Sequence, residues 1–95
     1  MAQRLVGVPW FNEAEYGACR ALMADAELLP VRYSEWLDAI TQEVAAILSQ
    51  GNSPMKVTIE PTAFVAWCRE RMLVRDQSAR RRYAAIAAFQ NMNLV

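Results

Sequence analysis

The sequence contains no histidine, and it has only two cysteines, three glycines and four prolines among 95 residues. Without an imidazole, the Ser–His and Cys–His pairs of many hydrolases cannot form unless another group replaces the base. Cys19 and Cys68 lie far apart, and two cysteines alone cannot complete a four-ligand zinc site. The three glycines form no phosphate-binding loop. We therefore expect no enzyme activity, no metal and no cofactor.

Long apolar runs are also missing. The longest are far shorter than the roughly 20 residues that span a bilayer, and residues 1–8 hold no apolar run long enough for a signal peptide. We expect a cytoplasmic protein without a membrane partner, in which the cysteines are free, buried thiols. The length allows one domain, placed over residues 1–95, with residues 1–8 as an arm or edge strand.

The formal net charge is zero, but the charges are unevenly distributed. Residues 1–54 carry three basic and seven acidic residues, whereas residues 55–95 carry seven basic and three acidic ones. Halves of opposite sign favour attraction within the chain or between two subunits. The alternative is a basic surface for an acidic partner.

Apolar side chains at three- and four-residue spacing predict two helices in the first half. The first covers about 13–24, with Asn12 as its N-cap. The second covers about 31–49, with Pro30 in its first turn and Gly51 at its C-terminal end in the left-handed conformation. Its apolar face is the clearest amphipathic signal in the chain and consists of Tyr33, Trp36, Leu37, Ile40, Val44, Ile47 and Leu48.

Residues 55–60 alternate apolar and polar side chains, which predicts a strand with one buried face. A single strand leaves its backbone groups unpaired, so it needs a partner. One candidate is the arm at residues 3–8. The other is the same strand of a second subunit, which would form a symmetric dimer.

Pro61 predicts the end of this strand and the start of a third helix over about 62–72. Asp76 is placed to cap a fourth helix over about 77–91. The expected fold is α+β and mainly α. It has four helices with one short strand or a minimal two-stranded sheet, in the order α-α-β-α-α.

Three short motifs lie on these predicted helices, and two of them share a proline followed by two aromatic residues. Together they resemble a family of small bacterial proteins of unknown function, over most of residues 9–88. The resemblance implies no activity and no catalytic residue. The motifs are Leu29-Pro30-x-x-Tyr33-x-Glu35-Trp36-Leu37, Ile59-x-Pro61-x-x-Phe64-x-x-Trp67-Cys68-Arg69 and Ala79-Arg80-x-x-Tyr83-Ala84.

The strongest polar feature is the run Arg80, Arg81 and Arg82, with Arg75 just before it. The last two predicted helices have the outline of a helix-turn-helix, in which the start of the second helix faces DNA bases. Three consecutive arginines spread around a helix, however, and the domain as a whole is not basic. A solvated or subunit-bridging arginine face is therefore favoured over binding to nucleic acid.

These observations predict a small non-catalytic interaction or accessory module that self-associates as a homodimer. Apolar burial would hold the dimer, with the acidic half of one subunit facing the basic half of the other, so that high salt weakens it. The alternative is a nucleic-acid-binding, helix-turn-helix-like module that uses the four arginines. The candidate interface residues are Trp10, Phe11, Met55, Val57 and Ile59.

Overall fold

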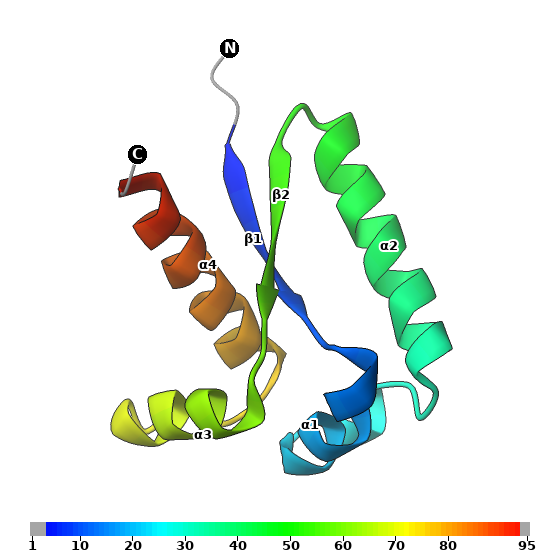
Figure 1. Ribbon diagram of the computed structural model, residues 1–95, viewed down its shortest axis with the longest axis vertical. Helices are drawn as coiled ribbons and strands as arrows, with labels where there is room; N and C mark the ends of the chain where they lie inside the picture. The colour runs from blue at the N-terminus through cyan, green and yellow to red at the C-terminus, as the bar shows by residue number, and fades with distance from the viewer. Residues whose placement is uncertain (1–3, 94–95) are drawn as a thin grey trace.

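The computed structural model describes residues 4–93, and within this range it contains four α-helices and a two-stranded sheet (Figure 1). The mainly helical α+β fold is thus confirmed in its two-stranded form. The elements are, in order, β1 (Leu5–Trp10), a 3-10 turn (Glu13–Glu15), α1 (Tyr16–Leu22), a second 3-10 turn (Ala26–Leu28), α2 (Tyr33–Ser49), β2 (Ser53–Thr58), α3 (Pro61–Glu70) and α4 (Gln77–Asn93).

The two strands pair in parallel, with Leu5 opposite Ser53 and Trp10 opposite Thr58. The direction follows from the connection, because a crossover through α1 and α2 returns the chain to the start of the sheet. The partner of the predicted strand is therefore the N-terminal arm of the same chain. Residues 1–3 of the predicted arm lie outside the described residues.

The strand pair lies between two helices, with α4 on one side and α2 on the other (Figure 1). α4 comes very close to β1. A Cβ added to Gly7 would overlap the backbone carbonyl of Ala84. Ala84 and Ala88 are buried, so small side chains and a glycine together allow this approach.

The core lies at the carboxyl ends of the two strands. Phe11 directly follows β1 and Ile59 directly follows β2, and the two side chains are 1% and 0% exposed. The rings of Tyr16 and Trp36 lie 5.5 and 5.1 Å from the ring of Phe11, between centroids. Other buried members of the same cluster are Cys19, Met23, Phe64, Cys68 and Ala79.

The first two helices begin later than predicted. Residues 13–15 form a 3-10 turn, and the Asn12 side chain makes no capping hydrogen bond. α2 begins at Tyr33 because Arg32 is still extended, with φ −90° and ψ 131°. The carbonyl of Pro30 accepts a hydrogen bond from the Tyr16 hydroxyl, so this proline ties the connection to α1 instead of opening a helix.

The second half follows the prediction more closely. The strand covers Ser53–Thr58, two residues earlier than predicted, because Glu60 is the N-cap of α3. The Glu60 carboxylate accepts hydrogen bonds from the amides of Thr62 and Ala63. Asp76 caps α4, with Oδ1 3.0 Å from the amide nitrogen of Ala79. Gly51 has φ +81°, as its predicted role requires.

Candidate functional site

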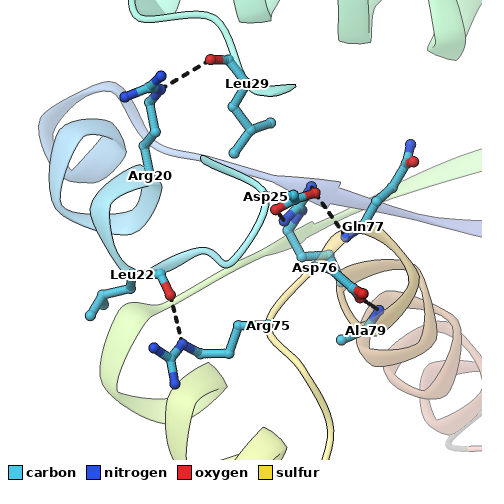
Figure 2. Close-up of polar contacts among 9 residues, drawn as sticks. Arg20, Leu22, Asp25, Leu29, Arg75, Asp76, Gln77 and Ala79 are labelled. Atoms are coloured by element: carbon cyan, nitrogen blue, oxygen red, sulfur yellow. Dashed lines mark hydrogen bonds and ion pairs between the residues drawn. The ribbon is translucent and has the colours of Figure 1, made fainter. Parts of the chain in front are cut away.

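The arginine run at the start of α4 is partly buried. The Arg80 side chain is 6% exposed, and its Nη1 and Nη2 donate to both oxygens of Asp25 at 2.9 and 3.0 Å. Asp25 Oδ2 also accepts from the amide of Gln77 (Figure 2). The hydrogen bonds from Arg80 are the largest cause that lowers the pKa of Asp25. This ion pair therefore fastens α4 to the connection between α1 and α2.

Two further arginines also reach into the first half of the chain. Arg81 Nη2 lies 2.7 Å from Glu43 Oε1, which links α4 to α2. Arg75 Nε donates to the carbonyl of Leu22 at 2.6 Å, as Figure 2 shows. The attraction between the two halves therefore operates within one chain. This corrects the expectation that Arg80 and Arg81 face an acidic surface of a second subunit.

The contacts of these arginines within the chain also argue against a DNA-binding helix-turn-helix. A recognition helix needs its N-terminal side chains free to reach base edges. In α4 these positions include Arg80, which is bound to Asp25, while Ala84 and Ala88 are buried. Of the four candidate arginines, only Arg82 is exposed and without a polar partner among residues 4–93.

The candidate interface residues lie mostly inside the chain's own fold. Phe11, Val57 and Ile59 are buried, at 1%, 8% and 0% exposure, because the pairing of β1 with β2 brings them into the core. Trp10 is half-buried, with its ring 5.3 Å from Trp36. Met55 is half-buried as well.

The outer edges of the two strands are protected from further pairing. Ser53 donates to the carbonyl of Arg4 and Ile59 to that of Trp10, so the odd-numbered residues of β2 face β1. Pro9 and Pro54 then occupy outward positions, where their missing N–H groups remove donors from both edges. Lys56 is also on the outer edge of β2 and is exposed. A dimer formed by strand pairing is therefore disfavoured.

Both cysteines are buried thiols without a disulfide. Burial raises the pKa of Cys19 to about 11 and raises that of Cys68. A protonated, inaccessible thiol is a poor nucleophile.

We therefore expect the native protein at pH 8 to react with a thiol-specific reagent far more slowly than the same protein unfolded in guanidinium. Stopped-flow absorbance of the released thiolate measures both rates. Equal rates would contradict the burial of these two side chains.

The part of the chain that the structure describes holds no group of three or more Cys, Asp or Glu side chains able to bind a metal ion. Over the same residues, no helix is both long and apolar enough to cross a membrane.

Comparison of the chain with family models, curated proteins and solved structures found no match. The resemblance to a family of small bacterial proteins thus stays a prediction.

The apolar face of α2 is only partly covered by the rest of the fold. Trp36 is its only buried residue, and Leu48 is 57% exposed. A helix of 17 residues is about 26 Å long, whereas a strand of six residues is about 20 Å long. Two strands therefore cannot cover the whole face. The half-buried residues are Tyr33, Leu37, Ile40, Val44 and Ile47.

Proposed function

We propose that the protein is a non-catalytic interaction module that binds a second copy of itself through α2. The observation that carries this proposal is the incompletely covered apolar face of that helix. Its amphipathic pattern is typical of a helix that buries a broad apolar stripe, yet Trp36 is the only residue of α2 that is buried.

The open flank has a composition suited to helix packing. Leu37, Val44 and Leu48 share one side of α2 by the helical period. Leu37 also packs against the core, and Leu48 is the most exposed of the three. Glu35 falls near the opposite side and Asp38 lies about 100° from this side, so neither carboxylate is at the centre of a contact between two copies. The same patch on both subunits gives a symmetric, isologous dimer.

The arginine–carboxylate pairs found within the chain change the expected response to salt. Because Asp25 and Glu43 are already bound to Arg80 and Arg81, the proposed dimer depends on apolar burial. Sodium chloride screens exposed charges but has little effect on apolar contact. The dimer should therefore persist at high salt.

Replacing Leu48 by glutamate should weaken the dimer by at least about tenfold, because it places a charge in an apolar contact. Light scattering after size-exclusion chromatography, over a range of loading concentrations, measures the change in mass. Leu28→Glu is the matched control, since Leu28 is 78% exposed but lies outside α2. An equal effect of the two substitutions, or none from Leu48→Glu, would contradict the use of α2.

A further inference from the structure

A second surface, independent of α2, lies where α3 ends and the chain turns into α4. Met72 is 93% exposed there and has φ +56°. Its amide donates to the carbonyl of Arg69, and the amide of Leu73 donates to that of Cys68. These two bonds form a Schellman C-cap, in which Met72 holds the position usually taken by glycine.

Methionine is an unfavourable residue at this position. A side chain at positive φ is strained, and glycine avoids this strain. A side chain as exposed as that of Met72 gains little from packing in return. Strained residues of this kind are concentrated at binding sites, so the position points to a role for the Met72 side chain outside the folded chain.

The surroundings of Met72 combine apolar and basic groups. A surface depression of about 300 Å³ is lined by Met72, Leu73, Val74 and Arg82, among others. Val74 is 61% exposed. Arg82 is exposed and has no polar partner within residues 4–93. The depression therefore presents aliphatic side chains next to a free guanidinium.

The charges of the turn are mainly positive. Arg69, Arg71 and Arg75 belong to the same turn or to the end of α3. The two acidic residues nearby are engaged. Asp76 caps α4, and Glu70 lies 3.6 Å from Arg71. This leaves the end of the molecule formed by α3 and the start of α4 with an excess of positive charge.

We propose that this surface, formed by Met72, Val74 and Arg82, binds an acidic segment of a partner protein. Apolar side chains of the segment contact Met72 and Val74, and a carboxylate of the segment pairs with Arg82. A protein segment fits better than nucleic acid. Most of the side chains that line the depression are aliphatic, and they offer apolar contacts in place of the hydrogen bonds that a phosphate-binding surface supplies.

The test uses the full chain and an array of short fluorescent peptides that combine Asp or Glu with Leu, Met or Phe. Matched peptides carry Gln in place of the acids or Ser in place of the apolar residues, and a duplex DNA is included. Fluorescence anisotropy measures binding. We expect tight binding only to peptides with both kinds of residue.

Met72→Gly is the decisive variant because its two expected effects have opposite signs. Relief of strain should raise the urea midpoint of unfolding, while loss of the side chain should weaken peptide binding by about tenfold. Arg82→Gln should weaken binding by a similar factor. The controls are Leu28→Gly and Arg4→Gln, which alter exposed residues elsewhere and should leave binding unchanged.

The Leu48→Glu variant separates this proposal from self-association. Leu48 is near the end of α2, far from the turn between α3 and α4 (Figure 1), so this variant should bind the peptides as the unmodified protein does. The proposal is overturned if no peptide in the array binds, if Met72→Gly binds as tightly as the unmodified protein, or if duplex DNA binds more tightly than every peptide.

Discussion

Replacing Gly7 by alanine is expected to destabilise the protein by about 3 kcal/mol or more, at the upper end of the usual cost of overpacking. The added methyl group would overlap the backbone of Ala84 in α4. A backbone carbonyl cannot rotate away as a flexible side chain can, so α4 must move off β1. Since a small domain has a total stability of only about 5–15 kcal/mol, much of the folded state could be lost.

Gly17→Ala is the matched control. Gly17 lies in α1, and a Cβ there would meet no atom within 4 Å. Alanine in a helix is more favourable than glycine by up to about 1 kcal/mol, so this variant should be as stable as the unmodified protein or more so. Urea unfolding followed by tryptophan fluorescence compares the two. A Gly7→Ala protein of normal stability would contradict the close packing of α4 on β1.

Replacing Asp25 by alanine should cost about 3–5 kcal/mol of stability, the range seen when one partner of a buried ion pair is removed. The Arg80 side chain is 6% exposed and would lose both of its carboxylate hydrogen bonds. The amide of Gln77 would lose its acceptor as well. Urea unfolding measures the loss.

The ion pair between Arg81 and Glu43 provides a comparison within the same helix. Its side chains are 51% and 40% exposed, and exposed pairs contribute at most about 1 kcal/mol. Glu43→Ala should therefore have a small effect. In a further variant, Asp25→Leu combined with Arg80→Met should recover part of the stability lost in Asp25→Ala, because no buried charge is left unpaired. Equal losses for Asp25→Ala and Glu43→Ala would contradict the burial of the first pair.

The same ion pair predicts how stability depends on pH. The folded protein holds the pKa of Asp25 below its ordinary value, so the contribution of this group is present above the pKa of the unfolded state, about 3.9. It is lost as the pH falls through the lower pKa of the folded state. As the pH is lowered, the free energy of unfolding should therefore fall less steeply for Asp25→Ala than for the unmodified protein.

The sequence predicts those features of the fold that depend on local chemistry. Gly51 and Asp76 end and begin helices as expected, because each role requires only a particular backbone angle or a nearby amide. The start of α2 is different. Pro30 and Pro61 have similar local sequences, but Pro30 is held by the Tyr16 hydroxyl, a contact between residues that are distant in the sequence. Spacing alone cannot predict such a contact.

The same limit applies to the candidate sites, because they too depend on contacts between residues that are distant in the sequence. Three successive arginines are typical of an exposed surface, and nothing near them in the sequence identifies Asp25 as a buried partner of Arg80. The opposite charges of the two halves indicate that the halves attract each other. They do not show whether this attraction acts within one chain or between two chains. The strain at Met72 was hidden as well, because no glycine marks the end of α3.

The mass of the unmodified protein in solution tests the central claim most directly, which is that α2 leaves an apolar face for a second copy while the charges are paired within each chain. Sedimentation equilibrium at low and at high sodium chloride, over a range of protein concentrations, measures it. The account predicts a dimer in equilibrium with its monomer and the same association constant in both salts. A monomer at every concentration, or a dimer that dissociates when salt is added, would contradict it.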